Sequence, residues 1–344
     1  MKYFYIISIF LVFSCKPDVK KDPVSKIQIT KPIIEELISP AQGNSSLPKL
    51  YSNGKEIFLS WVEKKDSISS LQYSVLKNDT WSSSEEIING KDWFVNWADF
   101  PAITENDGNI LTNFLQKSAD GTYTYDVKLN LFSSETKTWN NNILLNTDGT
   151  KSEHGFVSML PFKNDSFFVT WLDGRTTVNV ERENAQMTLR SAIVNKKGEI
   201  LEDILMDERV CDCCQTSAAI TNNGPIVVYR DRSSEEVRDI SIVRFENGDW
   251  TKPQAIYEDQ WVMPGCPVNG PSVDALGDNL AVAWFTAEND NPRVQAIFSE
   301  DNGKTFGLPI RIDSGNAIGR VDVTMISENK AIICWMEPQG NDTL

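Results

Sequence analysis

The chain repeats one pattern six times, in which a hydrophobic segment reaches an aromatic residue and then gives way to polar turn residues. The successive aromatics are 53, 57, 58, 55 and 51 residues apart, and they are Trp61, Phe114, Trp171, Tyr229, Trp284 and Trp335. A nearly constant period of this size is typical of folds built from one repeated structural unit. The repeat therefore aligns the chain with itself and indicates which distant segments meet in space.

Each repeat contains four short strand-like segments separated by turns rich in Gly, Asn and Asp. Strands at this spacing, joined by such turns, favour an antiparallel sheet. Repeated at 51 to 58 residues, they predict an all-β fold, a β-propeller of four-stranded antiparallel blades. Six units are visible, which predicts six or seven blades in the complete protein. A β-sandwich would not show this self-match, and no segment sustains the 3.6-residue period of a helix.

The last repeat is short, because only nine residues follow Trp335. We therefore expect residues 33–344 to form the propeller with an incomplete last blade. Residues 33–39, IIEELIS, resemble a fourth strand and are a candidate for closing that blade. Without a partner, the last blade would expose an unpaired strand edge.

The N-terminus has the pattern of an export signal, expected over residues 1–14. Lys2 precedes an apolar run at residues 3–13 that is too short to span a bilayer. The ending Val-Phe-Ser-Cys resembles a bacterial lipobox, which implies lipidation of Cys15 and a tether over residues 15–32. We expect an exported lipoprotein, periplasmic or at the cell surface, attached to the outer or cell membrane. An ordinary secretory signal cleaved nearby is the alternative.

The formal net charge is -15, from 48 acidic and 33 basic residues. A surface with this charge repels the phosphate backbone of nucleic acids. We therefore expect no nucleic-acid partner.

Residues 299–306, SEDNGKTF, match the Asp-box pattern S-x-D-x-G-x-T-W, with Phe306 in the last place. Weaker versions of this corner end at Trp81, Trp139 and Trp250. The chain thus resembles the sialidase-like, Asp-box (BNR repeat) propeller superfamily over nearly all of residues 40–344. The resemblance implies that the box stabilises the turn between the third and fourth strands. It also implies that the site lies on the opposite face, formed by segments before the first strands and after the second strands.

Several arginines and carboxylates follow the second strands of the third and fourth repeats. Guanidinium groups suit a planar carboxylate because they bind both of its oxygens. The candidate catalytic residues are Asp173, Arg175, Arg230, Asp231, Arg232 and Arg238. The resemblance implies an arginine triad, a Tyr–Glu nucleophile pair and an aspartic acid. However, an early Arg-x-Pro motif is missing, and Tyr229 occupies the core position of its repeat. Alternatively, the two aspartates pair with the adjacent arginines. An enzymatic activity stays open.

Other polar and aromatic residues precede the first strands, and these are the candidate ligand-binding residues: Trp97, Asp99, His154, Asn269 and Arg320. Aromatic rings stack on sugars, and polar side chains bind hydroxyl groups. The expected function is recognition, with hydrolysis left open, of a glycan or another small anionic ligand. A binding module without catalysis is an alternative, and Trp97 packed between blades is the structural alternative.

Cysteines form a second group of candidates. Cys211, Cys213 and Cys214 precede one first strand and Cys266 precedes the next, so the two groups should be neighbours. An oxidising compartment favours two disulfides, and a strained Cys213–Cys214 bridge is one of the pairings. Cys334 is expected to be a buried thiol.

The alternative for these cysteines is a metal or redox site. Cys213, Cys214 and Cys266 are the candidate ligands, with Met263 and His154 nearby in the alignment. Thiolate, thioether and imidazole ligands together suit copper or another soft metal. No cofactor is implied with certainty by the spacing.

Overall fold

The computed structural model describes residues 35–181, 184–340, 342 and 343. The signal peptide, Cys15 and the tether lie outside these residues. The chain divides into a short N-terminal unit ending at Ile38 and a main unit that begins at Ser39. All of the described strands belong to the main unit. None of the helices found in the described residues has the length and apolar character needed to cross a membrane.

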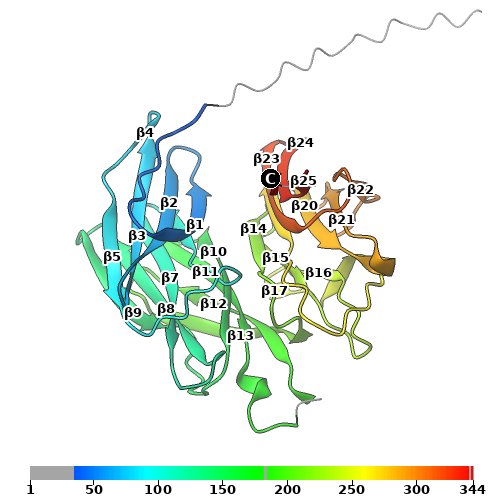
Figure 1. Cartoon of the computed structure of the whole chain (residues 1–344), viewed down its shortest axis with the longest axis horizontal. Coiled ribbons are helices and arrows are strands. Elements are labelled where there is room, and N and C mark those ends of the chain that lie inside the picture. Colours follow the sequence, from blue (N-terminus) through cyan, green and yellow to red (C-terminus); the bar gives the residue numbers. More distant parts are fainter. Residues whose placement is uncertain (1–34, 182–183, 341, 344) are drawn as a thin grey trace, which may run out of the picture. The chain divides into compact units, whose positions relative to one another are not determined.

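Five antiparallel sheets follow one another along the chain, each with four main strands in sequence order (Figure 1). The first contains β1 (Ser45–Ser52), β2 (Ile57–Lys65), β3 (Ile68–Lys77) and β5 (Glu85–Gly90), with β4 (Thr80–Trp81) also paired to β3. The second contains β6 (Ile103–Asn106), β7 (Asn109–Lys117), β8 (Tyr125–Ser133) and β9 (Thr138–Leu144). The third contains β10 (His154–Phe162), β11 (Ser166–Asp173), β12 (Met187–Val194) and β13 (Ile200–Val210).

The fourth and fifth sheets repeat this order. The fourth contains β14 (Ser217–Ile220), β15 (Pro225–Arg230), β16 (Ile240–Glu246) and β18 (Gln254–Tyr257), with β17 (Asp249–Trp250) paired to β16. The fifth contains β19 (Ser272–Leu276), β20 (Asn279–Thr286), β21 (Arg293–Ser299) and β22 (Ile310–Arg311). The prediction of an all-β fold with four-stranded antiparallel sheets is confirmed.

The sixth unit has two main strands, β23 (Gly319–Ser327) and β24 (Lys330–Met336), followed by the small pair β25 (Pro338–Gln339) and β26 (Asp342–Thr343). Residues 35–44 form no strand, so the described part of segment 33–39 does not complete this unit. The described residues therefore hold five full sheets and one partial sheet.

The six repeat aromatics all lie on the second strand of their unit. Five of them are buried, and Trp335 in the partial unit is half-buried. In three units the indole N–H donates to the acid two residues later, as from Trp171 to Asp173 at 2.8 Å. Large buried rings at a fixed strand position give every sheet the same core contact, which explains the period of the sequence.

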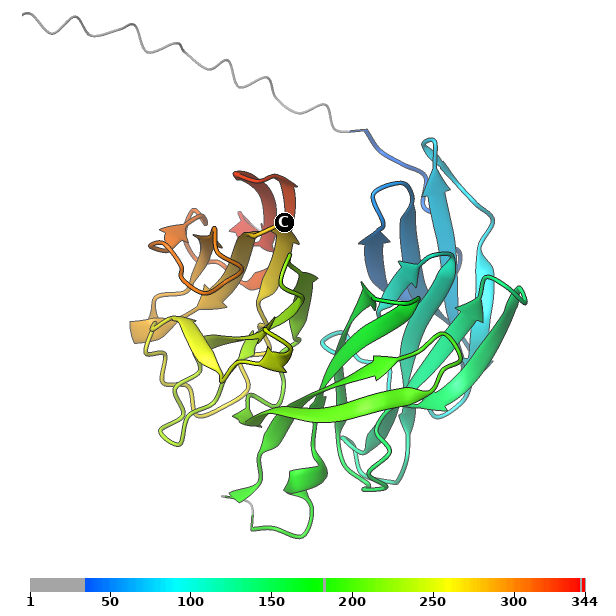
Figure 2. The ribbon, with the colours of Figure 1, turned by 180° about the vertical axis from the view of Figure 1, so that it is seen from behind.

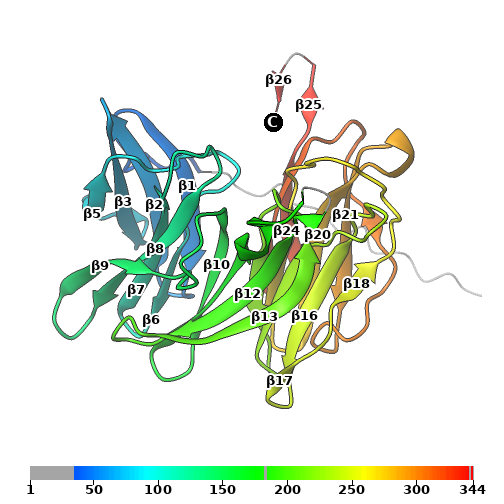
Figure 3. The same ribbon diagram turned by 90° about the horizontal axis from the view of Figure 1, so that it is seen from below.

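Neighbouring sheets pack through their first strands and through corner aromatics. The first strands contact one another in chain order: β1 with β6, β6 with β10, β10 with β14, β14 with β19 and β19 with β23. The colours of Figures 1 and 2 follow the same order, from blue to red. Between the first two sheets, the Trp139 ring lies 5.8 Å from that of Tyr73. Figure 3 shows the paired strands β12 and β13; β13 is followed by the cysteine segment, residues 211–214.

The Asp-box turn joins β21 to β22, as the sequence predicts. Asp301 accepts hydrogen bonds from the Thr305 backbone N–H at 2.8 Å, the Thr305 hydroxyl at 2.7 Å and the Ser299 hydroxyl at 2.8 Å. Gly303 has φ of 76°, a conformation that glycine adopts readily. Phe306 packs against the core of the fourth and fifth sheets. The box therefore acts as a local folding device.

Candidate functional site

The last unit contacts the segment before the second sheet, near the start of the first strands. The Arg320 guanidinium lies 4.2 Å from the centroid of the Trp97 ring. Trp97 belongs to the connection between β5 and β6, and Arg320 is the second residue of β23. Trp97 is 60% exposed. Two segments that are distant in the sequence thus form an accessible aromatic surface held by a cation–π contact.

The backbone around Arg320 is built to direct this side chain. Arg320 has φ of 59°, in the left-handed region that is unusual for a residue with a Cβ, and it forms part of a β-bulge. Asn269 accepts a hydrogen bond from the Arg320 backbone N–H at 3.0 Å and donates to the Ile318 carbonyl at 3.1 Å. The guanidinium also donates to the Val268 carbonyl. Asn269 therefore positions Arg320 from the neighbouring sheet.

A buried phenol links two carboxyl groups near this segment. The Tyr125 hydroxyl lies 2.8 Å from Glu153 Oε1 and 3.2 Å from Asp99 Oδ2. Asp99 also accepts a hydrogen bond from the Phe156 backbone N–H at 2.7 Å. Asp99 and Tyr125 are buried, whereas Glu153 is half-buried. Of these three side chains, Glu153 is the one that a ligand can contact.

Gly155 makes this arrangement possible. A Cβ at this position would overlap the carboxylate of Asp99. Asp99 can therefore approach β10 and bind the Phe156 backbone only because residue 155 has no side chain.

Burial raises the pKa of both carboxyl groups, to about 7 for Asp99 and to about 8 for Glu153. The negative charges of Asp99, Asp212 and Cys266 raise the pKa of Glu153 further, while the hydrogen bond from Tyr125 lowers it. A carboxyl group with this pKa is protonated near neutral pH and can donate a hydrogen bond or a proton. Glu153 thus has the protonation state of a general acid.

Two of the predicted catalytic residues pair with each other. Arg175 donates to both oxygens of Asp173, at 2.8 and 2.7 Å. Asp173 is fully buried, and burial raises its pKa, but the hydrogen bonds from Arg175 and Trp171 and the charge of His154 together outweigh this effect and the pKa is lowered. This is the pairing of adjacent residues that the sequence left open.

The other predicted catalytic residues also have internal partners. Arg230 is buried and donates to the backbone carbonyls of Asn269, Arg238 and Phe285. Arg232 makes a two-pronged pair with Glu236, at 3.0 and 2.7 Å. Asp231 accepts from the Ser241 hydroxyl at 3.0 Å, and burial raises its pKa. The guanidinium groups of these arginines bond to other parts of the protein. They therefore do not form a triad that is free to bind a substrate carboxylate.

His154 lies away from the exposed surface. Its ring is fully buried, with Nδ1 3.2 Å from the Tyr125 carbonyl oxygen and Nε2 3.3 Å from Asp148. Asp173 lies 3.8 Å from the same Nε2. Within the described residues, His154 groups with Asp148 and Asp173 and is not part of the cysteine cluster.

The cysteines gather as the repeat predicts. Cys211 Sγ lies 3.8 Å from Cys213 Sγ and 3.6 Å from Cys214 Sγ, and Cys266 lies within 4.8 Å of Cys213 and Asp212. All five cysteines of the described residues are free, so the two expected disulfides are not formed. Sulfurs at these separations are far beyond the S–S bond length of about 2.05 Å.

The thiols differ in their surroundings. Hydrogen bonds with Cys213 and Cys214, together with the charge of Arg238, lower the pKa of Cys211. Burial raises the pKa of Cys214 to about 12. Cys334, expected to be buried, is exposed, because β24 belongs to the partial unit and lacks an outer strand.

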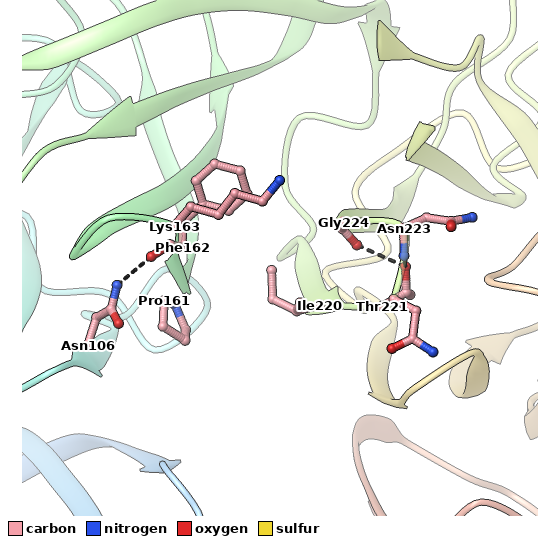
Figure 4. Close-up of a pocket in the computed structure, with 9 residues that line it drawn as sticks. Asn106, Pro161, Phe162, Lys163, Ile220, Thr221, Asn223 and Gly224 are labelled. Atoms are coloured by element: carbon pink, nitrogen blue, oxygen red, sulfur yellow. Dashed lines mark hydrogen bonds between the residues drawn. The ribbon is translucent and has the colours of Figure 1, made fainter. Parts of the chain in front are cut away.

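A separate pocket of about 330 Å³ lies at the opposite ends of the strands. It is lined by the turns after β10 and β14 and by Asn106, which donates to the Phe162 carbonyl at 2.6 Å (Figure 4). None of the predicted site residues lines it. Its lining consists of strand ends and turn residues without a cluster of reactive groups, so it does not support a functional site.

The sequence pattern did not identify Tyr125 or Glu153 as candidate site residues. Tyr125 begins the third strand of its unit, and nothing near it in the sequence indicates a carboxyl partner. Glu153 stands in a segment that the repeat places before a first strand, and this position was its only signal.

No protein-family model matches the chain, and no curated protein matches it. Solved structures do match. A protein of unknown function from Dyadobacter fermentans has a TM-score of 0.56 at 13% identity, over 86% of this chain and 91% of the other. An α-L-arabinanase from Penicillium chrysogenum, complexed with arabinobiose, has a TM-score of 0.50 at 13% identity, over 86% and 87%.

A third match is a polysaccharide lyase of family PL25, an ulvan lyase bound to a GlcA(1-4)Rha3S saccharide, with a TM-score of 0.50 at 11% identity, over 80% of this chain and 71% of the other. At 11 to 13% identity these similarities show a shared propeller fold. A fold hosts many functions, so the residues of the site have to carry the functional argument. The chain is thus similar in fold to carbohydrate-active propeller enzymes.

Proposed function

We propose that the protein binds a glycan bearing an anionic group, and that Trp97, Arg320 and Glu153 contact it. The observation that carries this proposal is the exposed Trp97 ring, fixed at 4.2 Å by the guanidinium of Arg320. An exposed aromatic ring offers a flat apolar surface on which a sugar ring stacks. Propeller neighbours crystallised with arabinobiose and with a uronic acid-containing saccharide support a carbohydrate as the ligand class.

Arg320 gives the site its preference for an anionic group. Its Nη1 donates to the Val268 carbonyl, and no other side-chain hydrogen bond of Arg320 occurs within the described residues. The remaining donors can bind the carboxylate or sulfate of an acidic sugar, which suits the fork of a guanidinium. The protonated Glu153 adds a hydrogen-bond donor for a ligand oxygen.

The geometry supports binding more directly than hydrolysis. Glycoside hydrolysis ordinarily uses two carboxyl groups that both reach the substrate, one as acid and one as base or nucleophile. Glu153 has the protonation of the acid, but its partner through Tyr125, Asp99, is buried. Cleavage of a bound glycan is therefore an activity to be measured alongside binding.

Calorimetric titration of the purified protein with neutral and acidic oligosaccharides tests the proposal. We expect an acidic oligosaccharide to bind, and Trp97→Ala to weaken it about fivefold to tenfold through lost stacking. Arg320→Gln should weaken acidic ligands more than neutral ones, because it removes the positive charge as well as the contact that fixes Trp97. Tyr257→Ala is the matched control, because Tyr257 is an exposed aromatic on the outer strand β18.

Two results would overturn the proposal. One is the absence of binding across the whole panel at millimolar concentration. The other is binding that Trp97→Ala leaves intact, which would place the ligand on another surface.

A further inference from the structure

The cysteine cluster between the third and fifth sheets has a geometry that glycan binding does not use. Cys211, Cys213 and Cys214 each present one sulfur, and the three sulfurs lie within 4.8 Å of one another. Around one metal ion with metal–sulfur bonds of about 2.3 Å, neighbouring sulfurs lie about 3.8–4.0 Å apart. The separations of 3.8 Å to Cys213 and 3.6 Å to Cys214 from Cys211 are close to this value. The three thiols are thus already spaced for a single ion.

The surroundings of Cys211 favour a thiolate. Arg238 is buried, and its Nη1 lies 3.0 Å from Cys211 Sγ, while its Nη2 is held by Glu236 at 2.6 Å. Arg230 and Arg320 are close enough for their charges to act on Cys214. Guanidinium groups stabilise thiolate, which is the form of cysteine that binds metals. Cationic side chains therefore offset part of the charge that three thiolates would bring into a buried site, most directly at Cys211.

The cluster can be reached from the surface. Cys213 is half-buried, and Cys266 is exposed. Cys266, Cys213 and Asp212 form a second group with ligand atoms within 4.8 Å of one another. The exposed Cys266 thiol and the half-buried Asp212 carboxylate therefore lie beside the buried pair of Cys211 and Cys214.

The number and type of ligands in the cluster indicate which metal it would bind. Three thiolates without a fourth ligand in the same group suit monovalent copper, which prefers soft sulfur ligands. Structural zinc sites almost always have four ligands, and here the fourth would have to be Cys266. Hard cations prefer oxygen ligands, and the buried members of the cluster offer sulfur only.

We propose that Cys211, Cys213 and Cys214 bind one Cu(I) ion in a trigonal thiolate site. Each thiol releases its proton to solvent when its sulfur binds the ion. Cys266 and Asp212 stand at the surface where the ion arrives. None of its ligands is a proposed glycan contact, although the charge of Arg320 acts on Cys214.

Titration of the reduced, purified protein with Cu(I) under anaerobic conditions tests this proposal, with a chromophoric chelator as competitor. We expect about one Cu(I) per chain and a three-sulfur environment in X-ray absorption. Cys213→Ser should lose the ion, and because Cys213 is half-buried, this variant has the best prospect of folding. Cys334→Ser is the control and should bind as the wild type does, since Cys334 lies on β24.

Cys266→Ser separates copper from zinc. A trigonal Cu(I) site keeps its ion in this variant, whereas a four-thiolate zinc site loses it. Circular dichroism of each variant reports folding, so a lost ion in a folded Cys213→Ser protein supports the proposal. It is overturned by failure of the wild type to bind Cu(I), by displacement of Cu(I) by equimolar zinc, or by thiol counting that finds Cys211 and Cys214 joined in a disulfide in the protein as isolated.

Discussion

Whether a side chain in this protein is available to a ligand depends on its packing and on a few hydrogen bonds. Trp97 and Trp139 are both tryptophans in connecting or edge segments, yet one is exposed and the other packs against Tyr73. Arg320 and Arg230 differ in the same way. Arg230 is saturated by three backbone carbonyls, and Arg320 keeps donors for a ligand. Residue type alone did not distinguish these roles.

Asp99 makes stability depend on pH. Its pKa is about 7 in the folded protein, against an ordinary value of 3.8. Between these values the folded chain holds a proton that the unfolded chain has released, so the free energy of unfolding falls as the pH rises. Glu153 and Asp207, with pKa values raised by burial to about 8 and about 6, act in the same direction. Asp173 has a lowered pKa and loses its contribution only at more acidic pH.

The wild type should therefore unfold a few degrees higher at about pH 5 than at about pH 8. Asp99→Asn should reduce this difference, because the amide cannot titrate but its oxygen still accepts from the Phe156 N–H. Thermal unfolding followed by circular dichroism across this range provides the measurement. Asp120→Asn changes an exposed aspartate and should keep the wild-type slope. An unchanged slope in Asp99→Asn would show that Asp99 is ionised in the folded state.

At the scale of elements, the turns are encoded locally. The Asp-box was predicted from eight residues, and the structure gives it the expected position between β21 and β22. Local encoding works here because the donors and acceptors of the turn lie within four residues of one another. The cysteine segment after β13, residues 211–214, also has distant partners: Arg238 from the connection between β15 and β16, and Cys266 from the connection between β18 and β19.

Asp301→Ala removes the acceptor of three hydrogen bonds in this turn. We expect the free energy of unfolding to fall by about 1–3 kcal/mol, because the Thr305 and Ser299 groups lose their partner. Denaturant titration gives the value. Glu300→Ala, at the exposed neighbouring position, is the control and should change stability little. Equal losses in the two variants would contradict the role given to the box.

At the scale of the whole molecule, the order of first-strand contacts from β1 to β23 agrees with the repeat. The number of blades in the complete protein stays a prediction, since the described residues hold five full sheets and a partial one. Export and anchoring also stay predictions, because residues 1–34 lie outside the described part.

Lipidation of Cys15 can be tested on the full chain in a bacterial host that processes lipoproteins. We expect the wild type to partition into the detergent phase and to incorporate labelled palmitate, because acyl chains on the cysteine add apolar surface. Cys15→Ser should move to the aqueous phase without label, and Cys334→Ser should behave as the wild type. Wild-type protein found only in the aqueous phase would argue for cleavage at an ordinary secretory signal.

The sequence by itself determined the period, the strand order, the turn at residues 299–306 and the proximity of residues 211–214 to Cys266. Each of these depends on neighbouring residues or on the repeat, and the same strand pattern returns in every unit. Only the tertiary structure decided which side chains remain available. Tyr125 meets Asp99 and Glu153 across separations of 26 and 28 residues, and Arg230 reaches carbonyls up to 55 residues away. These partners depend on how sheets pack and how deeply each group is buried, and burial, more than residue type, sets pKa values and free donors.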